Sequence, residues 1–395
     1  MPRRLAPIFV LVLLASTACD GGTSNNPDEV DDDLGDGELD GSGPGGIGTV
    51  TAGMADADPK VVEAESLLAA GKAERALATI DAAIAEDGSQ ARFFYVRGNA
   101  LTYLDRDAEA QAAYEKAIEL DANDALPHAA LGQLIAFRDG ADEAAKTRAV
   151  ELFQAALKLD PKLAAAHQSL GVVLIALGRH AEAVEALDNA DRLAGNVETA
   201  YLLAQAYGEL GETKKAVEHA RSAVEYEPEA SGADLRLLFA RLLLADGQTA
   251  EAAAEFERVA KLVPDSPPLR LEVARGLLEA GKPDAAMVHM QWLLETIPDE
   301  VPVIVNHGRV LTAQGKAKEA IARFDEALKQ APGNRAALTY KVEAQVAAKQ
   351  CKDARKTEAE LVAQLGWTAK DVAKAKDDQL PRALRKTHGY LAACK

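Results

Sequence analysis

Few side chains in this 395-residue sequence are spaced for catalysis or for metal binding. The seven histidines form neither an HExxH motif nor a short HxxxH pair, so their spacing does not predict a zinc site. The glycine-rich run 41–46 (GSGPGG) fits the GxGxxG pattern of dinucleotide sites, but the sequence predicts no strand before it and no helix after it. GxSxG and phosphate-loop motifs are absent from the sequence. We therefore expect no catalytic residue, no metal and no cofactor.

Cys19 is the cysteine with the clearest chemical context. It follows Arg3 and Arg4, an apolar run over residues 8–14 and small residues over 16–18, a signal-peptide pattern too short to span a membrane as a stable helix. The segment 15–19 (ASTAC) resembles the lipobox of bacterial lipoproteins, although Ser stands where Leu is usual. This resemblance implies a signal peptide over 1–18 and a stable lipid anchor on Cys19. The alternatives are a plain secretory signal with an incidental cysteine and an uncleaved membrane anchor.

Residues 19–56 are expected to form a flexible tether. Ten acidic residues and no Lys or Arg lie between positions 20 and 56, and few of the other residues are large and apolar. Such a segment cannot bury enough surface to offset the entropy of ordering it. The formal net charge of −18 for the whole chain also argues against a nucleic-acid partner and against attraction to an anionic membrane surface. We expect membrane contact through the lipid anchor only.

From about residue 57 the sequence is periodic, and the period describes the elements that must position any binding residue. An alanine recurs in each unit. A small residue and, in most units, a glycine stand before this alanine in the sequence. In most units a bulky apolar residue and then a proline stand after it. Glycine is expected to end the first helix of a unit and proline to mark the end of the second. The alanine recurs at a nearly constant interval, with the longest gap before its third occurrence: Ala76, Ala110, Ala149, Ala183, Ala216, Ala252, Ala286, Ala320 and Ala354.

This pattern resembles the tetratricopeptide repeat over residues 57–363. The resemblance implies an all-α fold, a right-handed α-solenoid of antiparallel helix hairpins. Its small residues would let the two helices of a hairpin approach closely, and its bulky residues would fill the space between hairpins. We expect about eight full repeats, a degenerate ninth from residue 335, and capping helices over 364–395. Five extra residues around 138–144 should lengthen the loop between the helices of the third repeat.

The C-terminal part of the chain differs from the rest in charge and in its cysteines. Residues 335–395 carry thirteen Lys and Arg against seven Asp and Glu, which predicts either a solvated cap face or a docking patch. Cys351 and Cys394 remain if Cys19 is lipidated. In an exported protein this even pair predicts a disulfide that pins the cap to the last repeat, and two free thiols are the alternative.

The resemblance also implies where a partner would bind, because the first helix of each repeat lines the concave face of such arrays. Position nine, which faces this groove in the family, carries Arg241, Arg275 and Arg309 in three successive repeats. These arginines would form a ladder for the carboxylates of an acidic or C-terminal peptide, or would pair with acidic residues of adjacent repeats. Further polar and aromatic groove contacts are expected from Arg92, Tyr95, Asn99, Tyr201 and Gln205.

Three classes of function are compatible with a repeat array: a scaffold for protein partners, an enzyme with a repeat arm, and a receptor for an anionic ligand or peptide that works with a transporter. Signal, tether and repeats extend to about position 363, so the remainder is too short for an active site with its own core. We expect a non-enzymatic scaffold in the cell envelope, lipid-anchored in the outer or inner membrane, with its repeats in the periplasm. Lipoproteins of similar layout assist pilus and secretin assembly, outer-membrane protein insertion or peptidoglycan-hydrolase control. The sequence selects neither one of these processes nor an oligomeric state.

Overall fold

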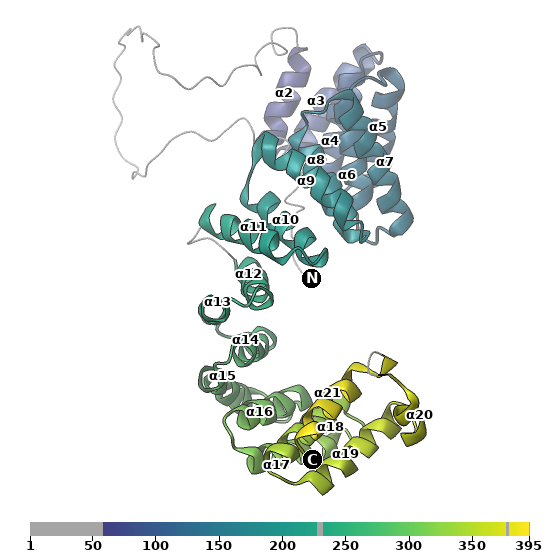
Figure 1. The fold of residues 1–395 in the computed structure, drawn as a ribbon. Coiled ribbons are helices and arrows are strands. Elements are labelled where there is room, and N and C mark those ends of the chain that lie inside the picture. The colour runs from purple at the N-terminus through teal and green to yellow at the C-terminus, as the bar shows by residue number, and fades with distance from the viewer. Residues whose placement is uncertain (1–57, 227–231, 377–378, 395) are drawn as a thin grey trace, which may run out of the picture. The chain divides into compact units, whose positions relative to one another are not determined.

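The chain folds into consecutive pairs of helices. The computed structural model describes residues 58–226, 232–376 and 379–394, and every regular element among them is a helix (Figure 1). The predicted all-α class of paired helices is confirmed. The signal peptide expected over 1–18, the lipidated Cys19 and the tether expected over 19–56 lie outside the described residues. None of the described helices is long and apolar enough to cross a membrane.

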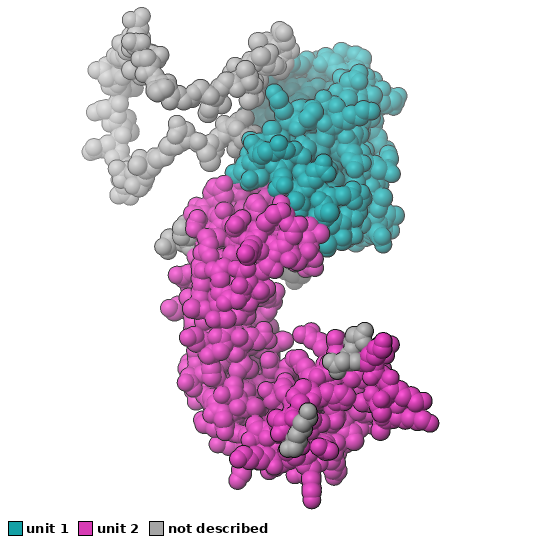
Figure 2. Space-filling model, in the orientation of Figure 1, with its two compact units in different colours: residues 1–195 teal, residues 196–395 magenta. Residues whose placement is uncertain are grey.

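The helices divide between two compact units, residues 1–195 and 196–395, which we describe separately (Figure 2). In each hairpin we call the first helix A and the second B. Unit 1 contains the hairpins α2 (Pro59–Ala69) and α3 (Ala73–Glu86), α4 (Ala91–Tyr103) and α5 (Asp107–Leu120), α6 (Ala125–Phe137) and α7 (Glu143–Leu159), and α8 (Ala164–Ala176) and α9 (His180–Ala194). Unit 2 contains α10 (Val197–Glu209) and α11 (Thr213–Tyr226), α12 (Ala233–Ala245) and α13 (Thr249–Leu262), α14 (Pro267–Glu279) and α15 (Pro283–Thr296), α16 (Val301–Ala313) and α17 (Ala317–Gln330), and α18 (Arg335–Ala347) and α19 (Cys351–Gln364).

The turn between helices A and B requires a left-handed backbone. Gly71 adopts φ 69°, and the amide of Lys72 then donates to the carbonyl of Leu67, which satisfies a free carbonyl at the end of α2. The second and ninth hairpins lack glycine at this point. Asp105 and Lys349 occupy it instead, with φ of 56° and 61°. These two hairpins therefore form the same turn, although a residue with a side chain is sterically disfavoured in the left-handed region.

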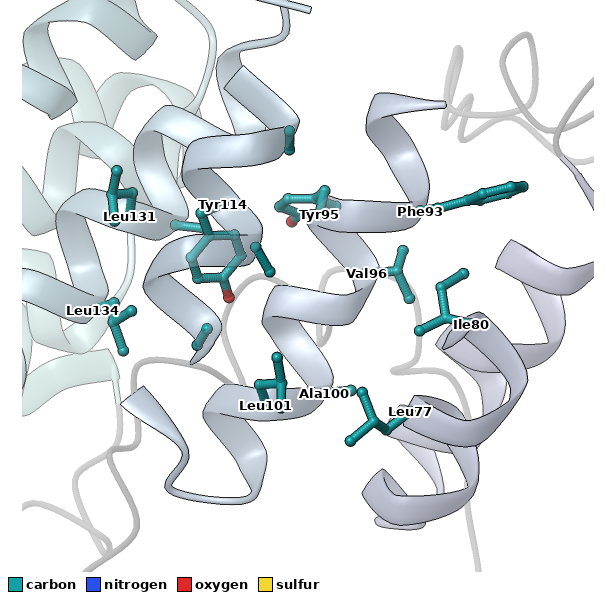
Figure 3. Packing of buried hydrophobic residues seen from close by; sticks show 14 of the residues in the cluster. Leu77, Ile80, Phe93, Tyr95, Val96, Ala100, Leu101, Tyr114, Leu131 and Leu134 are labelled. Carbon is teal, nitrogen blue, oxygen red and sulfur yellow. The ribbon is translucent and has the colours of Figure 1, made fainter. Parts of the chain in front are cut away.

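The recurring alanines lie in the core. All nine, from Ala76 to Ala354, are 0% exposed, so no larger side chain fits at these positions without a shift of the helices. The surrounding apolar residues pack in continuous clusters, and Figure 3 shows one around Ile80, Val96 and Tyr114 in unit 1.

The bulky residue of helix B also packs within its own hairpin, not only between hairpins as the sequence suggested. A Cβ atom added to Gly98 would lie 2.4 Å from Tyr114, and one added to Gly308 would lie 2.6 Å from Phe324. The sixth hairpin carries Ala240 at the corresponding position, and the ring of its bulky Phe256 lies against Gly276 of the next hairpin. The missing Cβ thus leaves room for a ring, and the ring contacts whichever hairpin supplies that room.

The five extra residues of the third repeat are shared between loop and helix. The loop between α6 and α7 spans residues 138–142, against three residues in the turn 70–72 of the first hairpin, and α7 has 17 residues where α3 and α5 have 14. Asp142 caps the lengthened helix by accepting a hydrogen bond from the amide of Ala145. The expectation of a longer loop alone was therefore incomplete.

Three further helical segments follow the last hairpin: α20 (Ala369–Lys374), α21 (Arg382–Leu391) and the 3₁₀ turn η3 (Ala392–Cys394). Leu380 and Leu384 pack against Leu338 of α18 and against Leu361 and Val362 of α19. Cys351, the first residue of α19, forms a disulfide with Cys394, with an S–S distance of 2.12 Å. These segments cover the apolar side of the last hairpin, as the end of a repeat array requires.

Candidate partner-binding face

The eight residues predicted to face a partner all lie on A helices, in two separate groups. Arg92, Tyr95 and Asn99 belong to α4 in unit 1. The other five belong to unit 2: Tyr201 and Gln205 on α10, Arg241 on α12, Arg275 on α14 and Arg309 on α16.

The unit 1 group forms contacts within its own hairpin and with α2 of the first hairpin. Nη2 of Arg92 lies 2.5 Å from Oε1 of Glu65 on α2, and its guanidinium stacks 4.8 Å from the centroid of the Tyr95 ring. The Tyr114 hydroxyl donates to Oδ1 of Asn99 at 2.8 Å. Burial raises the pKa of the Tyr95 phenol, so this hydroxyl stays neutral. These contacts form a polar network that joins α2, α4 and α5.

In unit 2, two of the three arginines of the ladder pair with α14, the A helix between them. Nη2 of Arg241 hydrogen-bonds to Oε1 of Glu272. Nη2 of Arg309 lies 3.7 Å from Oε1 of Glu279, and its Nη1 donates to Oδ1 of Asn306 at 2.8 Å. Both acidic partners sit on the repeat adjacent to their arginine. This is the pairing that the sequence left open as the alternative to ligand binding.

Arg275 is the third arginine, and its environment differs. Its side chain is exposed, and among the described residues it forms no ion pair. Glu272 and Glu279 flank it at three residues before and four residues after on α14, with their carboxylates committed to Arg241 and Arg309. Positive and negative groups therefore alternate along this face from α12 to α16, and Arg275 is the arginine of the ladder without an ion pair among the described residues.

The two glutamates were missed from sequence because only position nine was followed along the repeats. Glu272 and Glu279 stand at positions six and thirteen of the seventh repeat. Residues three and four apart on a helix share a face, so the same frame contained the signal. Tyr201 is half-buried on α10, and burial and the charge of Asp234 raise its pKa.

The ladder continues to the C-terminal helix through an aromatic ring. The guanidinium of Arg309 stacks 4.5 Å from the centroid of the Tyr340 ring on α18, and Nζ of Lys386 on α21 lies 5.5 Å from the same centroid. Burial and the nearby Glu343 carboxylate raise the pKa of Tyr390 on α21. The sequence did not predict that α21 would contact this face. No cluster of three or more His, Cys, Asp or Glu side chains suited to a metal ion occurs in the described part of the chain.

Comparisons with known proteins agree with this architecture. Family models described as tetratricopeptide repeat match residues 91–124, 146–197, 201–267, 243–304 and 311–366. No curated protein matches the chain in sequence.

Several solved structures are similar to parts of this chain. The YrrB structure, described as a TPR protein with an unusual peptide-binding site, is 22% identical, with a TM-score of 0.43, and covers 49% of this chain and 97% of its own. The structure of PilW, described as a type IV pilus biogenesis factor, is 20% identical, with a TM-score of 0.46, and covers 53% of this chain and 95% of its own. PilF of Pseudomonas aeruginosa is 19% identical, with a TM-score of 0.44, and covers 55% of this chain and 96% of its own.

The family matches extend over most of the helical hairpins, and the hairpins have the paired geometry and the buried small residues that the repeat requires. The chain belongs to the tetratricopeptide repeat family, whose members are scaffolds for protein–protein interaction.

Proposed function

We propose that this protein is a non-enzymatic scaffold that binds a protein or peptide partner on the A-helix face of unit 2. The observation that carries the proposal is Arg275, an exposed cation without an ion pair among the described residues, fixed on α14 between two inter-repeat ion pairs. A guanidinium offers a carboxylate two parallel hydrogen bonds, so an acidic side chain or a C-terminal carboxylate is the group it fits.

The second part of the proposal concerns location. The lipobox-like segment 15–19 and the acidic composition of 20–56 support a lipid anchor on Cys19 and a tether that holds the repeats in the periplasm, on the outer or the inner membrane. A scaffold so placed would assist the assembly of an envelope complex. Metabolic labelling with a fatty-acid analogue tests the anchor: the wild type should carry the label and Cys19→Ser should not. An unlabelled wild type would contradict this part.

Titration of a fluorescent tetra-glutamate peptide with a free C-terminus tests the binding face. The wild type should bind it, and Arg275→Glu should lower the affinity at least 10-fold, because a carboxylate would then meet a third glutamate on α14. The matched control is Lys261→Glu, which makes the same charge change in the same unit at the end of helix B α13, with no ion pair among the described residues.

Equal loss of affinity in both variants would show a general charge effect and would sink the assignment to Arg275. Free glutamate separates this function from the alternative of an anionic-ligand receptor. A free amino acid that binds as tightly as the peptide would favour the receptor.

A further inference from the structure

The C-terminal helix α21 lies on the A helix of the last hairpin, and the two contact each other (Figure 1). Lys386 places its ammonium group 5.5 Å from the centroid of the Tyr340 ring, and Tyr390 lies beside Glu343, which contributes to the raised pKa of its hydroxyl. Lys386 and Tyr390 are four residues apart and therefore project from one face of α21. One face of this helix thus offers a cation to an aromatic ring and a hydroxyl to a carboxylate.

The residues covered by α21 belong to the same face as the arginines. Glu343 stands at position nine of its repeat, as Arg275 and Arg309 do in theirs. Tyr340 is joined to the ladder directly, since Arg309 stacks on its ring. The chain's own C-terminal helix therefore occupies the last position of the proposed partner-binding face.

The noncovalent attachment of α21 rests on few buried side chains and on His388, whose Nε2 lies 3.4 Å from Oε1 of Glu358. The helix has ten residues, too few for a stable isolated helix. Of its side chains only Leu384 and Thr387 are buried, and Leu380 just before it completes the apolar contact. Thr387 also donates to Oε1 of Glu358 at 2.8 Å. Arg382, Arg385 and Lys386 are exposed.

The covalent attachment is at the far end of this segment. The Cys351–Cys394 disulfide joins the first residue of α19 to the turn after α21, across 43 residues of sequence. Nη2 of Arg355 also donates to the carbonyl of Cys394, at 3.4 Å. A cross-link that holds both ends of a loop together removes part of the chain entropy that release of α21 would otherwise gain.

We infer that α21 is an internal ligand of the α18 face and that reduction of the Cys351–Cys394 bond releases it. The reductant is a dithiol: its two sulfurs give up two electrons and two protons and form a disulfide, while the bond between Cys351 and Cys394 breaks into two thiols. Release bares Tyr340 and Glu343. A partner segment with Lys or Arg one helical turn before a tyrosine fits the position that α21 leaves. This use of the bared surface rests on the proposed function, whereas the release does not.

Hydrogen exchange of the purified protein with and without dithiothreitol tests the release. After reduction the amides of α21 should exchange at least 10-fold faster, because the disulfide no longer restrains the release of α21 from α18. The exchange of the amides of α16 and α17 should be unchanged. Cys351→Ser/Cys394→Ser should show the fast exchange in both conditions, which makes it the matched control. Unchanged protection of α21 after complete reduction would overturn the inference.

A second measurement tests the internal ligand. A free peptide of residues 380–391 should bind reduced protein or the double serine variant at least 10-fold more tightly than oxidised protein, and Lys386→Ala/Tyr390→Phe in the peptide should remove this gain. Fast exchange of α21 without peptide binding to either form would overturn the ligand half of the inference. Failure of the tetra-glutamate peptide to bind any form would instead contradict the proposed function alone, because neither measurement here depends on it.

Discussion

At the residue scale, the array depends on pairs in which a glycine, which has no side chain, faces a bulky side chain. Gly98 faces Tyr114, Gly171 faces Leu187 and Gly308 faces Phe324, each within one hairpin and each at the same separation in sequence. The sequence predicted both the small and the bulky residues, since each recurs at a fixed distance from the buried alanines. It did not predict that the small and the bulky residues contact each other, because periodicity gives a residue's position in the repeat and not the direction of its side chain.

Gly308→Ala should destabilise the protein by up to about 2 kcal/mol. Alanine is the better helix former by about 1 kcal/mol, but its Cβ would lie 2.6 Å from the fully buried Phe324 ring, and overpacking of a core costs about 1–3 kcal/mol. The control is Gly389→Ala in α21, where no atom lies within 4 Å of the added Cβ, and which should be neutral or stabilising. Urea denaturation measures both, and a stabilised Gly308→Ala variant would refute the packing argument.

Stability should fall as the pH drops below about 6.5, and His307 should account for part of that fall. Burial lowers the pKa of this histidine, as do Arg323 and Lys316, while Glu326 and Glu319 raise it. The unfolded chain therefore binds the proton at a higher pH than the folded protein, so stability is complete above the unfolded pKa and is lost toward the folded pKa. His307→Gln should show a shallower loss of unfolding free energy between pH 7 and 5 than the wild type. Parallel curves for the two proteins would exclude His307 as the cause.

At the scale of elements, the ninth hairpin is less degenerate than its sequence. It lacks the glycine and the proline of most other repeats, yet α18 and α19 have 13 and 14 residues, like the helices of the eighth hairpin. The turn is retained because Lys349 adopts the left-handed conformation that glycine supplies in most of the other hairpins. In the sequence, Lys349 departs from the repeat pattern. In the structure, packing of Ala354 and Leu361 in the core decides the turn geometry.

Lys349→Gly should therefore stabilise the last hairpin by about 0.5–1 kcal/mol. A left-handed residue with a side chain costs about 1–2 kcal/mol, and part of the gain is offset by the greater freedom of glycine in the unfolded chain. The neighbouring Ala348 has φ −77°, so Ala348→Gly brings the entropic loss without the steric gain and should destabilise. Denaturation monitored by Trp367 fluorescence, which reports on the apolar cluster of this hairpin and the cap, separates the two signs.

At the scale of the whole molecule, the sequence predicted a ladder of cations and the structure shows an alternation of charges. The repeat period places Arg241, Arg275 and Arg309 on successive A helices, and this much follows from the frame. The pairing of these charges depends on residues at other positions of the repeat, so position nine alone could not reveal it. The division into two units likewise has no marker in the periodicity, which continues across residue 195.

The double variant Glu272→Gln/Glu279→Gln should bind the tetra-glutamate peptide more tightly than the wild type. It leaves Arg241 and Arg309 without their carboxylate partners, so that all three arginines of the ladder lack an ion pair instead of one. Exposed ion pairs contribute about 0–1 kcal/mol each, so the cost in stability should be small. Peptide titration at low and high salt measures the effect, and an unchanged affinity at low salt would show that the partner does not contact these repeats.

The third hairpin accommodates its five extra residues without loss of its core contacts. This bears on how the length of such a chain can change in evolution. Gly132 still faces Phe153, although the two lie further apart in sequence than the other glycine pairs. The added chain lies in the loop and at the start of α7, and Ala141 and Ala145 join the apolar cluster of unit 1 while the Gly132–Phe153 contact is kept. Insertions and deletions at the turn between helices A and B are therefore nearly neutral for the rest of the array. We expect relatives of this protein to differ in length mainly at these turns, and new loops grafted there to leave the stacking intact.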